Sequence, residues 1–252
     1  MTRSPLKRAA RSLTLVMLLL SPSAALAAVC QTMAIPAYFE PGALWTKAGA
    51  AAGVEIMVMN PDSGVGRTSD PSYLGAVRAS QAAGVLVIGY VYTSYGRRSA
   101  ADILTEIDTY MAWYGVDGIF FDEVSSDARL VPYYRQFADA VHREQSLVVL
   151  NPGTYPAEDY MHIADVVLTF EGAFDAYRAL RVPPWVWNHD PDKFWHLIYG
   201  VSSSARMKTV LRWAQSNNVG YMYVTNDRLN NPWDTLPSYF AAELGELAKT
   251  CQ

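Results

Sequence analysis

The chain has 252 residues, of which 51% are hydrophobic and 17% charged, so it can bury a large core and is not compositionally disordered. This length allows one large domain or two small ones, and a single α/β barrel fits within it. The formal net charge of −4 argues against a nucleic-acid-binding protein, because phosphate contacts need clustered lysine and arginine side chains.

The start of the chain predicts a secretory signal peptide. A basic stretch precedes an apolar run at Leu13–Leu20 and a cleavage signal at Ala25-Leu26-Ala27, and the run is too short to anchor the chain in a membrane. The basic residues are Arg3, Lys7, Arg8 and Arg11. We expect cleavage of residues 1–27 near Ala27, leaving a secreted or periplasmic domain of residues 28–252. Loss of four basic residues and no acid leaves that domain a formal charge of −8, which favours a cationic ligand.

Only two cysteines are present, Cys30 and Cys251, and they lie almost at the two ends of the exported domain. In an oxidising compartment such a pair is most simply a disulfide that ties the termini together. Catalytic thiol chemistry is not expected, because neither cysteine lies near a strand end in the body of the chain.

Apolar runs bounded by turn residues alternate with longer stretches of helical periodicity along the whole chain. The expected strands are Met33–Phe39, Val54–Asn60, Val85–Val91, Gly118–Phe121, Leu147–Leu150, Val166–Phe170, Phe194–Tyr199 and Tyr221–Thr225. The expected helices are Leu44–Ala52, Pro71–Ala83, Ser99–Tyr114, Val131–Glu144, Ala157–Ile163, Ala205–Ser216 and Leu236–Ala248.

Strands that are apolar throughout are buried on both faces, as in a parallel sheet covered by helices. Eight strand–helix units in this length predict a single α/β domain with the (β/α)₈ TIM-barrel fold. A doubly wound open sheet is the alternative, but no G-x-G-x-x-G motif follows the first strand to favour it. No linker or change of composition divides residues 30–252.

Carboxylates follow two of the most apolar strands. Asp122 and Glu123 come directly after Gly118–Phe121, and Glu171 comes directly after Val166–Phe170. In a TIM barrel the carboxyl ends of the strands form the active-site face. An apolar wall favours the protonated form of a carboxyl group, as a general acid requires, and two facing carboxylates suffice for glycoside hydrolysis. An acid after a strand is also a common helix cap, but three together favour a catalytic site.

Further polar and aromatic residues are expected in the loops at this face, where amides bind hydroxyl groups and flat rings stack on sugars or attract an ammonium group. The candidate substrate-binding residues are Tyr38, Asn60, Tyr92, Thr93, Asn151, Asn226 and Trp187.

Other catalytic chemistries have no motif in the sequence. The four histidines show no H-E-x-x-H or related ligand spacing, and no G-x-S-x-G elbow of a serine hydrolase occurs. We therefore expect no metal ion and no organic cofactor. A metal-dependent deacetylase is the alternative to which a metal requirement would point.

Six short strings stand in order between residues 33 and 227. They are Ile35-Pro-Ala-Tyr-Phe39, Asn60-Pro61 with Ser63-Gly64-Val-Gly66, Gly89-Tyr-Val-Tyr-Thr-Ser-Tyr-Gly96, Trp113-Tyr-Gly-Val-Asp-Gly-Ile-Phe-Phe-Asp-Glu123, Asn151-Pro-Gly153 and Thr169-Phe-Glu171. Together they resemble the spherulin 4-like family of glycoside hydrolases, and the W-Y-x-x-D-G-I-F-F-D-E block is specific.

The resemblance implies a TIM-barrel hydrolase that cleaves α-1,4-linked galactosamine or N-acetylgalactosamine polysaccharide, such as galactosaminogalactan or a biofilm exopolysaccharide. We expect a monomer. We expect endo-action with retention. The family's acidic trio matches Asp122, Glu123 and Glu171. Related polygalactosaminidases keep acids only at the positions of Asp122 and Glu171, which implies that Asp122 is the nucleophile and Glu171 the acid/base. Glu123 would then bind substrate or tune its neighbour.

Two questions stay open at the level of sequence. Adjacent strand residues point to opposite faces, so Asp122 and Glu123 point into the site together only if the strand has already turned into its loop. A non-catalytic carbohydrate-binding or cell-wall coat protein is the alternative function, and the presence of all three acids argues against it.

Overall fold

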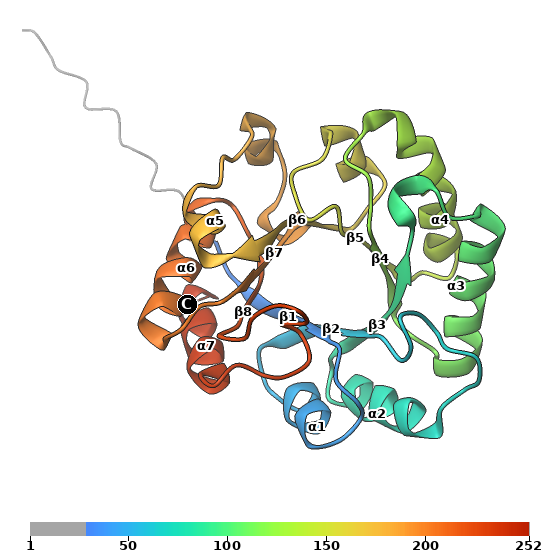
Figure 1. The fold of residues 1–252 in the computed structure, drawn as a ribbon, viewed down its shortest axis with the longest axis horizontal. Coiled ribbons are helices and arrows are strands. Elements are labelled where there is room, and N and C mark those ends of the chain that lie inside the picture. The colour runs from blue at the N-terminus through green and yellow to red at the C-terminus, as the bar shows by residue number, and fades with distance from the viewer. Residues whose placement is uncertain (1–28, 252) are drawn as a thin grey trace, which may run out of the picture.

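The computed structural model describes residues 29–251, and the predicted signal peptide lies outside this range. Eight parallel strands form a closed barrel in sequence order, with β8 pairing back onto β1, and helices surround it (Figure 1). The strands are β1 Thr32–Ala37, β2 Val54–Met59, β3 Leu86–Tyr92, β4 Gly118–Asp122, β5 Leu147–Leu150, β6 Val166–Ala173, β7 Phe194–Tyr199 and β8 Tyr221–Val224. The predicted (β/α)₈ TIM barrel is confirmed.

Seven α-helices follow the strands in the described chain. They are α1 Ala43–Gly49, α2 Pro71–Ala82, α3 Ala100–Tyr114, α4 Val131–Arg143, α5 Phe174–Arg178, α6 Ser204–Ser216 and α7 Phe240–Leu247. Local sequence sets several of their ends. Asp70 caps α2, because its side chain accepts hydrogen bonds from the Ser72 backbone N–H at 2.7 Å and from the Ser72 hydroxyl at 2.6 Å, and Pro71 stands in the first turn. Gly115 ends α3 in the left-handed region at φ 60°.

Large rings fill the inside of the barrel below the strand ends. Phe120 of β4 contacts Trp195 of β7 edge-on, with ring centroids 5.6 Å apart, although these strands are not neighbours. Tyr90 of β3 stacks on Phe120 at 6.3 Å and so links this core to the mouth of the barrel. Phe120 and Trp195 are fully buried, and burying such a side chain stabilises the fold by about 2–3 kcal/mol.

Two predicted segments differ from the observed ones. The helix expected at Ala157–Ile163 is instead a five-residue 3₁₀ segment, Glu158–His162, which buries only Tyr160 and Met161. The Tyr160 hydroxyl anchors it by donating to the Asp127 carbonyl at 2.9 Å. The sixth strand, expected to end at Phe170, continues to Ala173 because it keeps pairing with β7. Glu171 therefore lies within the strand rather than after it.

The two ends of the described chain are tied together beside β1 and β8. Cys30 and Cys251 form a disulfide with Cα atoms 4.4 Å apart, which confirms the predicted pairing. Next to it, the Gln31 backbone N–H donates to the Thr250 hydroxyl at 2.7 Å. Disulfides of this kind are typical of proteins that fold in an oxidising compartment. No helix within residues 29–251 is long and apolar enough to cross a membrane.

Candidate active site

A cavity of about 410 Å³ opens at the carboxyl ends of the strands. All three acids of the predicted trio line it together with an amide and aromatic and apolar side chains. The lining residues are Tyr95, Asp122, Glu123, Asn151, Pro152, Gly153, Glu171, Tyr199 and Leu229. The barrel thus brings residues from the ends of six strands, β3 to β8, or from the loops that follow them, into one cavity, as barrel enzymes do.

One amide group joins the two most buried acids of the cavity. The Asn151 Nδ2 donates to Asp122 Oδ1 at 2.8 Å and to Glu171 Oε2 at 2.9 Å. Its Oδ1 accepts the Gly153 backbone N–H at 2.8 Å, which turns the amide nitrogen toward the acids. The Asn-Pro-Gly turn after β5 therefore holds the carboxylates of β4 and β6 close to each other.

This shared donor limits the distance between the two acids. Both carboxylate oxygens lie on one nitrogen, so they are no further apart than the 2.8 and 2.9 Å bonds laid end to end, about 5.7 Å. Carboxyl groups of retaining glycosidases stand about 5–5.5 Å apart, and those of inverting enzymes about 6.5–9.5 Å. The upper limit for the facing oxygens of Asp122 and Glu171 lies below the separation of an inverting pair.

Each of these acids has a second uncharged donor. The Tyr90 hydroxyl donates to Asp122 Oδ2 at 2.8 Å, and the indole N–H of the buried Trp233 donates to Glu171 Oε1 at 3.2 Å. Tyr38 packs edge-on against Tyr90, with ring centroids 5.6 Å apart. No lysine or arginine within residues 29–251 forms an ion pair with either acid, so uncharged groups alone hold them in place.

Burial without a cation changes the titration of the acids. Desolvation is the main cause that raises the pKa of Asp122, although the hydrogen bonds from Tyr90 and Asn151 oppose it. Desolvation likewise raises the pKa of Glu171, and the nearby Asp122 charge adds to the rise. Because ionisation of one acid disfavours ionisation of the other, the pair favours a state with a single negative charge.

The chain turns sharply directly after Asp122. Glu123 has a left-handed backbone with φ 52°, and its carbonyl accepts the Thr93 hydroxyl at 2.8 Å and the Tyr95 backbone N–H at 2.7 Å. The turn breaks the alternation of the strand, so Asp122 and Glu123 line the same cavity. The sequence left open which of the two side chains faces the site, and in the structure both line it.

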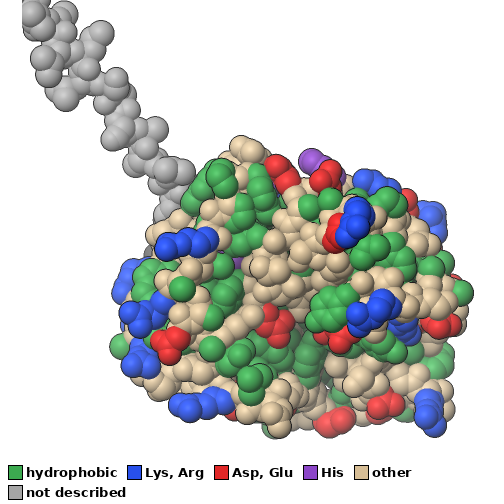
Figure 2. All heavy atoms as spheres, turned by 45° about the horizontal axis from the view of Figure 1, so that its top comes forward, with side chains coloured by type: hydrophobic (Ala, Val, Ile, Leu, Met, Phe, Trp, Pro, Cys, Tyr) green, Lys and Arg blue, Asp and Glu red, His purple; other side chains and the backbone are tan. Residues whose placement is uncertain are grey.

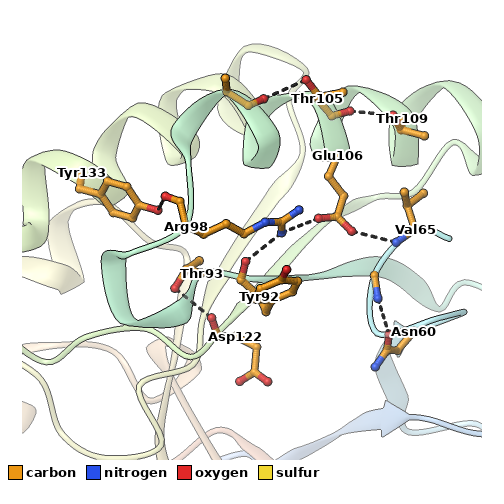
Figure 3. A network of polar contacts seen from close by, with 12 residues as sticks. Asn60, Val65, Tyr92, Thr93, Arg98, Thr105, Glu106, Thr109, Asp122 and Tyr133 are labelled. Carbon is orange, nitrogen blue, oxygen red and sulfur yellow. Dashed lines mark hydrogen bonds and ion pairs between the residues drawn. The ribbon is translucent and has the colours of Figure 1, made fainter. Parts of the chain in front are cut away.

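A buried ion pair connects two loops beside this turn (Figure 3). Glu106 of α3 pairs with Arg98 at 2.6 Å and accepts the Val65 backbone N–H at 2.9 Å, so it joins the loop after β2 to the loop after β3. Arg98 also donates to the Tyr92 carbonyl at 3.0 Å and lies 4.2 Å from the centre of the Tyr92 ring. The Tyr133 hydroxyl donates to the Arg98 carbonyl at 2.7 Å.

The predicted substrate-binding residues lie in different surroundings. Asn151 reaches the acids, and Tyr38 packs beside them against Tyr90. Thr93 is fully buried, and its hydroxyl donates to the carbonyls of Asp122 and Glu123, so it shapes the turn instead of facing a ligand.

Of three other predicted residues, two form hydrogen bonds within loops and one lines a different cavity. The Asn60 side chain accepts the Gly64 backbone N–H at 2.9 Å, and the Asn226 side chain accepts the Ser238 backbone N–H at 2.7 Å. Tyr92 lines a separate cavity of about 730 Å³ between the loop after β2 and α3. None of the three lines the cavity that holds the acids.

Trp187 lies far from the place that the sequence interpretation gave it. It belongs to the 3₁₀ segment Pro184–Asn188, which leads into the start of β7 instead of following a strand end. The adjacent Val186 carbonyl accepts a hydrogen bond from Asn218, just before β8 begins. Trp187 is therefore at the amino ends of the strands, opposite the acids, and its expected place at the mouth was wrong.

Sequence reasoning did not single out Tyr90 or Trp233 as partners of the acids. Tyr90 could have been found by alternation, because it stands two residues before Tyr92 in an inward-facing series of the same strand. Trp233 stands in a predicted loop after a strand, where aromatic rings are expected to stack on sugars, but nothing in the sequence indicates its contact with Glu171, 62 residues earlier. No group of three or more potential metal ligands is present within residues 29–251.

Comparison with known proteins agrees with these motifs. The sequence matches the model of spherulation-specific family 4 over residues 32–246. The chain belongs to this family. It is 39% identical to spherulin-4 of Physarum polycephalum over 226 residues, which is 83% of this chain and 68% of that protein.

Solved structures agree with the fold. The crystal structure of Aspergillus clavatus Sph3 in complex with GalNAc has a TM-score of 0.73 and 21% identity, and the match covers 87% of this chain and 98% of that one. The catalytic domain of a hyperthermophilic chitinase from Pyrococcus furiosus has a TM-score of 0.52 and 12% identity, over 89% and 98% of the two chains. At these identities the likeness concerns the barrel alone.

Proposed function

We propose that this protein is an endo-acting, retaining glycoside hydrolase that cleaves α-1,4-linked galactosamine or N-acetylgalactosamine exopolysaccharide. The observation that carries the proposal is the placement of Asp122 and Glu171 on the single amide nitrogen of Asn151. That spacing suits a carboxylate that attacks a sugar and a carboxyl group that protonates the leaving oxygen.

In the first step the ionised Asp122 attacks the anomeric carbon, while the protonated Glu171 gives its proton to the glycosidic oxygen. The bond to the leaving sugar breaks and a glycosyl ester forms on Asp122. In the second step Glu171 takes a proton from water, the water oxygen attacks the same carbon, and Asp122 leaves as a carboxylate. Both residues then return to their starting protonation states.

The neighbouring groups fit these roles. Asn151 and Tyr90 donate to Asp122 and stabilise its charge between turnovers, and the apolar surroundings favour the proton on Glu171. Glu123 lines the same cavity without any side-chain hydrogen bond in the described structure, so its carboxylate is available for a substrate hydroxyl or ammonium group. The aminosugar assignment is supported by family membership and by the GalNAc bound to the Sph3 relative.

The test is incubation of the purified protein with partly deacetylated α-1,4-galactosamine polymer, with chitosan and with a neutral glucan, followed by mass spectrometry of the products. We expect internal cleavage of the galactosamine polymer into oligomers, and binding that weakens as salt screens the negative domain. If the protein binds the polymer but releases no shorter products, the non-catalytic coat or carbohydrate-binding function replaces this proposal.

A further inference from the structure

A second cavity adjoins the candidate active site. It also measures about 410 Å³, and it shares Tyr199 and Leu229 with the cavity that holds the acids. Its lining residues are Ala173, Phe174, Asp175, Tyr199, Gly200, Arg206, Arg228 and Leu229. We call it the arginine cavity and the first one the acid cavity. Because they share two lining residues, the two cavities form neighbouring halves of one surface. Figure 2 shows a face of the molecule on which acidic (red) and basic (blue) side chains stand among apolar ones (green).

Leu229 and Tyr199 line both cavities and so form an apolar border between the halves, which we call the ridge. Leu229 is 66% exposed, an unusual position for a large aliphatic side chain, and the half-buried Tyr199 ring packs edge-on against Trp233 beneath it. Trp233 in turn donates to Glu171, so the ridge is built directly on the proposed acid/base. A flat sugar ring can pack on this ridge with a neighbouring unit in each cavity.

The two halves carry opposite charge. Asp122, Glu123 and Glu171 line the acid cavity, whereas Arg206 and Arg228 line the arginine cavity. Because charge of one sign attracts substituents of the other, the two halves favour different sugar units.

The two arginines of the arginine cavity have no acidic partner within residues 29–251. The Arg206 guanidinium lies 5.2 Å from the centre of the Phe174 ring, which holds it at the cavity wall. Asp175, the one acid in this lining, has an 88% exposed side chain and pairs with Arg178 at 3.7 Å. Its charge is therefore directed to solvent and to another arginine.

We infer that the arginine cavity is a second sugar subsite, which selects a unit that bears a carboxylate next to the aminosugar unit held by the acid cavity. Guanidinium groups present paired N–H donors that match a carboxylate, and an ammonium group there would be repelled. The inference rests on the proposed function for one point, that the ligand is a sugar chain. It adds the substrate class, which is a heteropolymer of basic and acidic units.

Binding is measured by titration calorimetry at low salt with the Asp122→Asn protein, in which no turnover consumes the ligand. The probes are digalacturonate, di-N-acetylgalactosamine and digalactosamine. We expect digalacturonate to bind about 5- to 10-fold more tightly than the neutral disaccharide, as two exposed charge contacts allow. NMR shifts of the Ala173 and Gly200 amides identify the cavity in which it binds.

The double substitution Arg206→Gln with Arg228→Gln should abolish the preference for digalacturonate. The matched control is Arg212→Gln, which removes another exposed arginine of α6 that donates to Thr209 and does not line this cavity. The control should keep the preference. Equal binding of acidic and neutral disaccharides, the absence of binding by any probe, or a preference that survives the double substitution would each overturn the inference.

The hydrolysis of a galactosamine polymer by the unsubstituted protein is followed separately. If the polymer is cleaved but the arginine cavity shows no anion preference, the subsite fails and the proposed function stands. If digalacturonate binds as expected but no aminosugar polymer is cleaved, the proposed function fails and the subsite stands. The two results therefore cannot be confused.

Discussion

Glu106, which is buried, and Glu171, which is half-buried, are two glutamates near the mouth of the same barrel, and they are held in opposite ways. Glu106 faces a cation, Arg98 at 2.6 Å, and also accepts a backbone N–H. Glu171 has only the uncharged donors Asn151 and Trp233. The first arrangement is an ion pair that ties two loops together, and the second leaves a carboxyl group that can hold and release a proton.

The comparison shows which property separates a structural acid from a candidate catalytic one at this site. Burial alone does not, because Glu106 is the less exposed of the two and yet has a cationic partner. The partner decides: an arginine satisfies Glu106, whereas desolvation and the charge of Asp122 raise the pKa of Glu171. Buried acids without a cationic partner are therefore the groups to test for chemistry.

The largest expected effect is the loss of turnover when either candidate catalytic acid is neutralised. Asp122→Asn and Glu171→Gln should each lower kcat by about 10³-fold or more, because each removes a group that acts on the reacting atoms. Initial rates on galactosamine oligomers measure this. Azide should partly restore the Glu171→Gln variant on substrates with a good leaving group. Wild-type activity in both variants would contradict the assignment.

Neutralising Glu106 should instead lower stability. Glu106→Gln leaves Arg98 without its partner in a largely buried position, so the free energy of unfolding should fall by about 3 kcal/mol. Urea unfolding followed by circular dichroism measures it. The folded variant should keep a kcat far above that of Glu171→Gln. A stable Glu106→Gln protein with no turnover would contradict the assignment of Glu106 as a structural residue.

Glu123→Gln should affect binding more than chemistry. Its carboxylate lines the acid cavity but does not share the amide of Asn151, so we expect KM to rise about 10-fold, the size of one lost hydrogen bond to a charged group. Steady-state kinetics separate KM from kcat. If kcat collapses here while Asp122→Asn remains active, the two neighbouring acids must exchange roles.

The raised pKa values also predict a pH-dependent change in stability. A buried acid with a raised pKa costs no stability below its unfolded pKa, about 4, and costs progressively more as pH rises through its folded pKa. Asp122→Asn and Glu171→Gln remove this cost. Their Tm should exceed that of the wild type at pH 7.5, and the gain should shrink toward pH 4. A gain that is larger at pH 4 would contradict the desolvation of these acids.

The smallest expected effect is that of Trp187→Ala. The side chain is 53% exposed and lies at the end of the barrel opposite the acids, so kcat/KM should stay within about twofold of wild type, as for most surface substitutions. A clear loss of polymer binding would show that this end of the barrel also contacts the substrate.

The strand order and the main acids could be predicted because they depend on local pattern. Apolar runs such as Gly118–Phe121 identify buried strands, and the residue after such a run stands at the mouth of a barrel. Asp122, Glu171 and Asn151 were all found in this way. The disulfide followed from two cysteines at opposite ends of the sequence.

What could not be predicted depends on contacts between distant loops. The inward turn of Glu123 is held by Thr93 and Tyr95, about thirty residues earlier, and no local pattern encodes that contact. Trp233 reaches Glu171 from the loop after β8. Trp187 was misplaced because Pro184–Asn188 reads as a loop in the sequence, which does not say at which end of the barrel it lies.

The most direct test of the paired acids is the stereochemistry of the first product. Because Asp122 and Glu171 share one amide nitrogen, their facing oxygens stand within about 5.7 Å, which is closer than the separation of an inverting pair and favours a double displacement. Proton NMR during hydrolysis of an α-linked galactosamine oligomer should therefore show the α-anomer first, followed by slow mutarotation. Initial appearance of the β-anomer would mean inversion and would contradict the assignment of Asp122 as the nucleophile.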